Sequence, residues 1–370
     1  MIPVKQFPNL NGLRFFAALI VLLIHIEALK KTEGYSSLSS LRFFSNSSQI
    51  AVTFFFVLSG FLITYFLMND YDNTKKREKI TRFYINRILR IWPLYYVLIL
   101  IGFFILPNIS FFQLPTSELY DKNFNKRFIY YLFFLPNIGA FLAGKQLFIG
   151  NVWSLAVEEF FYLFFPLFFY FTSFKRLERS LWIVFVVFVV LCFLLHSSLF
   201  VPHNKIGLYL KGWADTYRLY AFAVGSLAAY YFICTPEQVK SIRLDWFWRF
   251  STGLLLMLVI LVVFGATFGF FTQQIYSVLF GCFLFCLIYS TKKYRMLNLS
   301  LINYLGKISF GIYMLHPLAI IIAIKSFGLQ INNGFMSLFL LYVTVILLTI
   351  AMSSLSYYFL EKPFLKLRKT

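Results

Sequence analysis

Charged residues are scarce in this chain, and their scarcity excludes a soluble globular domain. Asp, Glu, Lys and Arg make up 13% of the 370 residues, whereas an ordinary soluble domain carries about a quarter. Hydrophobic residues make up 60% of the chain, and the mean hydropathy is +0.76. That fraction is enough for about ten helices of ~20 residues, the length that the hydrocarbon core of a bilayer requires. The composition therefore predicts an all-α, polytopic membrane protein of about ten spans.

Cysteine is also rare, with only four in the chain. All four fall in or at the edge of apolar segments and show neither metal-ligand nor disulfide spacing, so we interpret them as small core residues and expect no metal site. They are Cys192, Cys234, Cys282 and Cys286. No repeat, low-complexity tract or soluble domain interrupts the apolar pattern, and we expect residues 1–370 to form one integral membrane domain.

Acidic residues are outnumbered by basic ones, 14 against 34, which gives a net charge of +20. A strongly basic chain can bind nucleic acid. Here, however, the basic residues cluster beside the apolar runs, as expected of residues that fix membrane topology. We therefore expect membrane lipids and no nucleic acid as partners.

The apolar runs predict ten membrane spans. The first, Leu13–Leu29, is followed by Lys30 and Lys31 and has no small-residue cleavage site, so we expect a span and no cleavable signal peptide. The ten predicted spans are Leu13–Leu29, Ile50–Met68, Ile91–Leu106, Trp153–Phe171, Leu181–Leu195, Thr216–Ile233, Trp248–Phe270, Tyr276–Tyr289, Ile308–Ile324 and Phe335–Leu360.

An eleventh apolar stretch, Phe128–Leu142, is interrupted by Pro136, Asn137 and Gly139. If this stretch crossed the membrane, several later basic clusters would lie outside, against the positive-inside rule. If it does not cross, these clusters are all cytoplasmic; they are Lys75 to Arg90, Lys175 to Arg179, Lys292 to Arg295 and Lys362 to Lys369. We expect the second arrangement, with both termini cytoplasmic and the stretch interfacial or re-entrant on the outer face.

Ionisable residues deep in a span are costly and indicate function. Of the four histidines, we expect only His25 and His316 well inside spans, and of the fourteen acids only Glu158 and Glu159. Counting ~1.5 Å per residue from opposite ends of their spans, His25 and Glu158 reach a similar depth. A carboxylate beside a histidine controls its tautomer and charge, so the pair predicts a general base.

Arginines near the inner ends of the first and third spans suggest an anion site. Arg14 and His25 are eleven positions apart, so they share one helix face, roughly 16 Å apart along the axis. Arg87 and Arg90 also share a face and could form a phosphate fork. Other roles are open: Arg14 as a snorkelling anchor, the basic run with Arg82 as a topology signal, and both histidines as packing partners between helices.

Several sequence blocks resemble, in order, the acyltransferase-3 family of membrane O-acyltransferases. They cover residues 10 to 364, and one departure is Asn11, where the family more often has an acid. The blocks are Leu10–Arg14 with His25, Phe55–Leu62, Arg87–Tyr95, Trp153–Tyr162, Asp215–Arg218 with Gly225, Ile308–Pro317 and Glu361–Phe364. Some members carry an appended extracytoplasmic hydrolase-like domain, and this chain resembles the form without it.

The resemblance implies transfer of an acyl group, usually acetyl from acetyl-CoA, to a hydroxyl of a cell-surface or exported glycan or a lipid-linked saccharide, such as lipopolysaccharide, at the inner membrane. The expected catalytic residues are His25, Glu158 and Glu159, with Ser59 and His316 as further candidates. For the CoA phosphates we expect Arg14, Arg82, Arg87 and Arg90, and for the acceptor Asp215 and Arg218, although these two could instead form a local ion pair. No metal is expected.

Two questions stay open at this stage. The histidine could deprotonate the acceptor hydroxyl or take the acyl group itself. Intramembrane His and Glu groups also serve as proton relays, so a proton-coupled transporter or flippase is the alternative function. The sequence does not give the oligomeric state.

Overall fold

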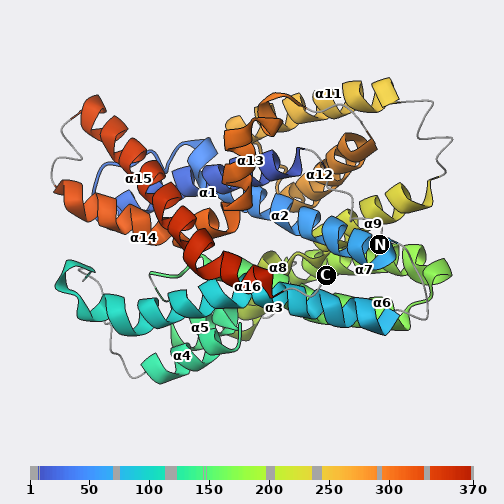
Figure 1. Ribbon diagram of the computed structural model, residues 1–370, viewed down its shortest axis with the longest axis horizontal. Coiled ribbons are helices and arrows are strands. Elements are labelled where there is room, and N and C mark those ends of the chain that lie inside the picture. The colour runs from blue at the N-terminus through green and yellow to red at the C-terminus, as the bar shows by residue number, and fades with distance from the viewer. Residues whose placement is uncertain are drawn as a thin grey trace. The chain divides into compact units, whose positions relative to one another are not determined.

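The computed structural model consists mainly of helices (Figure 1). It describes residues 7, 9–69, 76–112, 123–144, 146, 148–196, 205–235, 244–289, 294–328 and 334–367, and no strand occurs among them. The principal helices are α1 (Leu10–Thr32), α2 (Arg42–Met68), α3 (Lys76–Leu100), α4 (Phe124–Leu132), α5 (Pro136–Ala143), α6 (Val152–Phe171), α7 (Phe174–His196), α8 (Lys205–Tyr217), α9 (Leu219–Cys234), α11 (Leu244–Val263), α12 (Thr272–Tyr289), α13 (Ser300–Lys307), α14 (Ser309–Phe327), α15 (Phe335–Ser356) and α16 (Lys362–Lys366).

Within the described residues, nine helical segments are long and apolar enough to cross a membrane. They coincide with nine of the ten predicted spans, which confirms the prediction of an all-α polytopic protein. The tenth, Thr216–Ile233, coincides with α9, which has 16 residues. At 1.5 Å per residue that helix is about 24 Å long, short of a ~30 Å hydrocarbon core.

α9, the helix of the predicted span Thr216–Ile233, is short because the backbone turns just before it. Arg218 adopts a left-handed conformation with φ of 34° between α8 and α9. A bulky residue takes that conformation rarely, and it interrupts a right-handed helix. The helix therefore begins at Leu219, three residues after the predicted start of the span at Thr216.

The apolar stretch Phe128–Leu142, which we expect not to cross, falls in α4 and α5. These helices have nine and eight residues and pack against each other. Neither is long enough to span a bilayer. Arg127 connects them, because its guanidinium donates to the main-chain oxygen of Ala143, 3.1 Å away.

The described chain forms two compact units whose segments alternate along the sequence. Unit 1 comprises residues 1–13, 46–81 and 157–299, and unit 2 comprises residues 14–45, 82–156 and 300–370. The single membrane domain expected from the sequence stays a prediction. The cytoplasmic orientation of the termini also stays a prediction. Five residues of the basic clusters on which it depends lie outside the described residues: Lys75, Lys292, Lys293, Arg368 and Lys369.

In unit 1, α2 and α9 approach so closely that only glycine fits at two points. A Cβ on Gly60 of α2 would collide with the main-chain oxygen of Phe222, and one on Gly225 of α9 would collide with that of Val57. In a membrane, where lipid is as apolar as leucine, close packing of small residues is a main source of helix association. These two glycines hold α2 and α9 together.

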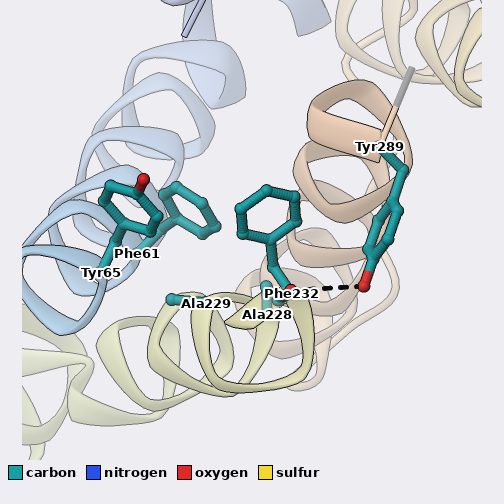
Figure 2. Packing of buried hydrophobic residues seen from close by; sticks show 6 residues of the cluster. All are labelled: Phe61, Tyr65, Ala228, Ala229, Phe232 and Tyr289. Atoms are coloured by element: carbon teal, nitrogen blue, oxygen red, sulfur yellow. Dashed lines mark hydrogen bonds between the residues drawn. The ribbon is translucent and has the colours of Figure 1, made fainter. Parts of the chain in front are cut away.

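An aromatic cluster continues this contact along α2, α9 and α12. Phe61 and Tyr65 of α2 face Phe232 of α9, and Tyr289 of α12 lies on its other side (Figure 2). The Tyr289 hydroxyl donates to the main-chain oxygen of Phe232 at 3.4 Å. Three helices of unit 1 thereby share one buried core.

In unit 2, α14 and α15 run side by side (Figure 1). A Cβ on Gly311 of α14 would lie 3.1 Å from the Cβ of Ser353 of α15, which shows how close the backbones are. Tyr304 of α13 also donates to the hydroxyl of Ser354, 2.8 Å away. This packing fixes α14, which carries His316.

Candidate active site

The two histidines that the sequence places inside spans meet in unit 2. Nδ1 of His25, on α1, lies 2.6 Å from Nε2 of His316, on α14. The ring planes differ by 10° and the ring centres are 4.9 Å apart, so the rings meet edge to edge as a hydrogen bond requires. His316 is fully buried, whereas His25 is only partly buried.

The hydrogen bonds of His316 determine which nitrogen of each neutral ring carries a proton. Nδ1 of His316 lies 3.3 Å from the main-chain oxygen of Ile312, which can only accept. Nδ1 of His316 therefore bears the proton, and its Nε2 accepts from Nδ1 of His25. The lone pair of His25 is left on Nε2, the nitrogen outside this chain of bonds, where it can take a proton or attack a carbonyl carbon.

Glu27 is another buried ionisable residue of unit 2, one that was not singled out from the sequence. It is fully buried on α1, where Lys30 and Tyr342 donate to its Oε1 at 2.9 and 2.6 Å, and the amide of Leu38 donates to Oε2. Glu27 lies in the last third of α1, and the expectation that only Glu158 and Glu159 lie well inside spans stays a prediction. A glutamate is tolerated there because Lys30, three residues on, neutralises it.

Glu158 and Glu159 lie on α6 in unit 1, and both are partly buried. The hydroxyl of Tyr162, one turn further along α6, donates to the Glu158 carboxylate. That hydroxyl also lies 3.2 Å from the hydroxyl of Ser59 on α2. Ser59, Tyr162 and Glu158 therefore form one hydrogen-bonded chain, and Tyr162 is a member that the sequence did not single out.

The partner of His25 in the structure is His316, at Nδ1. The predicted pairing of His25 with Glu158 stays a prediction, because His25 belongs to unit 2 and Glu158 to unit 1. A partner for His25 that is 291 residues away in the chain could not be found from local spacing.

The predicted donor-binding arginines all belong to unit 2. Arg14 lies on α1, and the others lie on α3; all are partly buried, and those on α3 are Arg82, Arg87 and Arg90. Arg87 also covers the ring of Phe83, 5.3 Å from its centre. Their role toward CoA stays a prediction.

One acid accompanies these arginines. Glu361, near the end of the C-terminal helical segment, is buried and lies close enough to Arg90 to interact with it electrostatically. The hydroxyl of Ser356 donates to its carboxylate at 3.2 Å. Glu361 therefore places a carboxylate in the electrostatic surroundings of Arg90.

The predicted acceptor residues lie at the junction of α8 and α9. Nε of Arg218 donates to the main-chain oxygen of Asp215 at 2.7 Å, while the Asp215 carboxylate pairs with His196 at 3.2 Å. The buried guanidinium donates further to Gln49 and Thr53 of α2 and to Gln273 of α12. Arg218 thus joins three helices, and its role toward an acceptor stays a prediction.

The structure also bears on metal chemistry. Among the described residues, no group of three or more His, Cys, Asp or Glu side chains is arranged to hold a metal ion.

The helices and the histidine pair define a polytopic membrane protein with ionisable side chains buried among apolar helices. The model of the acyltransferase domain family matches residues 7–358, nearly the whole chain. The chain therefore belongs to this family, as the sequence blocks predicted.

The chain is also similar to curated proteins that are named O-acetyltransferases. It is 27% identical over 385 aligned residues to the O-acetyltransferase OatA of Staphylococcus aureus strain NCTC 8325 / PS 47, and equally to that of strain COL. Each alignment covers 98% of this chain and 58% of the relative, so the chain spans about three-fifths of the length of these relatives. No solved structure matches the chain.

Proposed function

We propose that this protein is an inner-membrane O-acyltransferase that moves an acyl group, acetyl in the first instance, from cytoplasmic acyl-CoA to a hydroxyl of a cell-surface or exported glycan. The observation that carries this proposal is the His25–His316 pair, which leaves one basic nitrogen, Nε2 of His25, available for reaction. Membership of the acyltransferase family and similarity to proteins named O-acetyltransferases support it.

In the direct route, His25 acts as a general base. Its Nε2 takes the proton of the acceptor hydroxyl while the oxygen attacks the thioester carbonyl, the carbon–sulfur bond breaks, and the proton then passes to the CoA thiolate. In the covalent route, Nε2 attacks the thioester carbonyl first, and the carbon–sulfur bond breaks to release the CoA thiolate. The acceptor hydroxyl then takes the acyl group, which breaks the carbon–nitrogen bond, and its proton passes to the thiolate. Both routes need the same free nitrogen.

His316 supports either route by holding the ring of His25. When Nε2 of His25 gains a proton or an acyl group, the ring becomes cationic and its Nδ1–H becomes a stronger donor. Nε2 of His316 accepts this hydrogen bond, 2.6 Å away, and stabilises the cation. His316 therefore orients His25 in the way that an acceptor orients the histidine of a catalytic triad.

The charged groups of the two units would serve the two substrates. Arginines bind phosphate bidentately, which suits Arg14, Arg82, Arg87 and Arg90 to the CoA phosphates. Asp215, with its exposed carboxylate, suits a sugar hydroxyl. The chain of Ser59, Tyr162 and Glu158 provides a carboxylate that can exchange protons, and we assign it to the same reaction.

The test is consumption of the thioester by the purified protein. Detergent-purified protein should release free CoA from acetyl-CoA only when an acceptor glycan is present, and mass spectrometry should find the acetylated glycan. His25→Ala should lower the turnover rate by about 10²–10⁴-fold, the usual contribution of a general acid or base. Thr32→Ala, an exposed change on the same helix, is the matched control and should retain full activity.

Two results would contradict the proposal. One is near-normal glycan acetylation by well-folded His25→Ala protein. The other is proton-coupled solute movement in proteoliposomes without any CoA release, which would favour a transporter.

A further inference from the structure

Pro317 removes one main-chain hydrogen bond from α14, directly beside the candidate active site. A proline has no amide hydrogen, so the main-chain oxygen four residues earlier loses its usual helical partner. That oxygen belongs to Tyr313. His316 is the residue immediately before the proline, and Ile312, which binds its Nδ1, is the residue immediately before Tyr313. The defect therefore lies in the turn that orients His316.

A side chain from a distant part of unit 2 donates to this oxygen. Nδ2 of Asn151 lies 2.5 Å from the main-chain oxygen of Tyr313 and 3.4 Å from that of Met314. Asn151 is 5% exposed, so water does not compete strongly for these oxygens. Its amide hydrogens thus replace the donor that Pro317 lacks.

Asn151 is in a position where its side chain would ordinarily serve its own helix. It directly precedes α6, and asparagine there commonly caps the first amides of the helix. Instead its Nδ2 faces α14, and its Oδ1 is buried with no hydrogen-bond partner among the described residues. Asn151 thus makes a long-range contact with α14 in place of the capping bond that its position favours. We take this contact as the structural role of Asn151.

The next turn of α6 holds the same tyrosine by its side chain. The hydroxyl of Ser154 lies 2.5 Å from the hydroxyl of Tyr313, which also donates to the main-chain oxygen of Asn151 at 3.4 Å. The ring of Tyr313 in turn meets the ring of His316 edge to face, with centres 5.8 Å apart. The start of α6 therefore holds both the backbone and the ring of Tyr313, next to His316.

We infer that Asn151 is a positioning residue of the histidine pair. By binding the main-chain oxygen of Tyr313, it fixes the turn Ile312–His316, so that His316 keeps Nδ1 on Ile312 and Nε2 on His25. His25 then keeps its proton on Nδ1 and its lone pair on Nε2. This inference rests on the proposed role of His25, and it assigns to the break in α14 a function in the same site.

The test asks whether replacing Pro317 rescues the loss of Asn151. Asn151→Ala should lower the turnover rate by on the order of 10–100-fold, because small displacements of a catalytic group have effects of that size, with the KM for acetyl-CoA little changed. Pro317→Ala supplies an amide hydrogen to the Tyr313 oxygen. The double variant Asn151→Ala/Pro317→Ala should therefore recover most of the lost rate. Asn108→Ala removes an exposed asparagine that also binds a main-chain oxygen and should have no effect.

A spectroscopic readout separates this inference from the proposed function. In ¹⁵N-histidine NMR spectra of the membrane-embedded protein, His25 and His316 should both appear as Nδ1–H tautomers. Asn151→Ala should mix the tautomers, and the double variant should restore them. These spectra do not depend on turnover, so an absence of CoA release by the wild type would contradict the proposed function and leave the inference to be decided by the spectra.

Three results would overturn the inference that Asn151 positions the histidine pair. A double variant that is as slow as Asn151→Ala, or wild-type tautomers and rate in Asn151→Ala, would overturn the inference. If Asn151→Ala does not accumulate in the membrane, the inference requires the double variant to accumulate, and equal loss of both would overturn it.

Discussion

The histidine pair of unit 2 and the Arg218 cluster of unit 1 are both buried polar junctions between helices, but they use their hydrogen-bonding capacity differently. Arg218 donates from all three of its nitrogens to four neighbouring residues. The chain from Ile312 through His316 to His25 ends on a nitrogen with a free lone pair. A group whose bonds are nearly all used holds a fold together, whereas a group with one free position can react.

The two junctions also differ in charge, which is permanent on Arg218 and transient on the histidines. The guanidinium of Arg218 is permanently charged and is surrounded by neutral oxygens, so its hydrogen bonds must be kept for the cation to stay buried. Imidazoles can be buried neutral and gain charge only during a reaction. The same apolar surroundings therefore stabilise a scaffold in unit 1 and permit proton transfer in unit 2.

The largest effect on stability is expected at Arg218. Arg218→Lys keeps the charge but cannot reproduce the planar set of donors, so several bonds to α2 and α12 are lost. Hydrogen bonds between membrane helices contribute about 0.6–1.7 kcal/mol each, which predicts a loss of about 2–4 kcal/mol in the free energy of unfolding. Thermal unfolding in detergent measures it, with the exposed Arg249→Lys as control.

One result at Arg218 would contradict its assignment as a purely structural residue. If Arg218→Lys kept its unfolding temperature but raised the KM for the glycan, the arginine would be an acceptor ligand as the sequence predicts, and its bonds to α2 would be incidental.

A smaller effect is expected at His316. His316→Leu removes the acceptor for Nδ1–H of His25, and the turnover rate should fall by on the order of 10–100-fold through loss of orientation. His316→Gln offers an amide oxygen to the same N–H and should retain more activity. The measurement is the pH profile of the rate, which should change in His316→Leu because the partner of the titrating ring is gone. An unchanged rate and profile in His316→Leu would assign His25 a different orienting group.

The smallest effect is expected at the arginines of α3. Arg87→Lys keeps the charge but loses bidentate pairing with phosphate, so CoA affinity should fall about tenfold, or ~1.4 kcal/mol. A CoA-binding titration measures this, with the exposed Arg179→Lys as control. Wild-type affinity in folded Arg87→Lys would indicate that Arg87 only marks membrane topology.

The fold class could be predicted because it follows from composition. A chain with 60% hydrophobic residues cannot expose them to water, and the lengths of the apolar runs give the helices directly. The stretch Phe128–Leu142 was also predictable, since Pro136 and Gly139 interrupt it and the structure divides it into α4 and α5. What composition cannot give is local backbone conformation, and so the left-handed Arg218, which shortens α9, was missed.

The candidate site could be predicted only in part. His25 and His316 were visible as rare ionisable residues in apolar helices, but their pairing joins α1 to α14 and depends on packing that spacing does not encode. Glu27 was overlooked because it lies near the end of its apolar run, beside Lys30, where a charge is unremarkable. Asn151 carried no signal at all, because a polar residue before a helix is ordinary.

The two glycines between α2 and α9 also matter during synthesis of the protein. α9 is about 24 Å long and would be a weak insertion signal for the translocon by its length alone. The ribosome completes α2 about 150 residues earlier, so a surface shaped by Gly60 is already in the bilayer when α9 emerges. Gly225 can dock there as soon as it is made, and the earlier helix would then act as an internal chaperone for the later one.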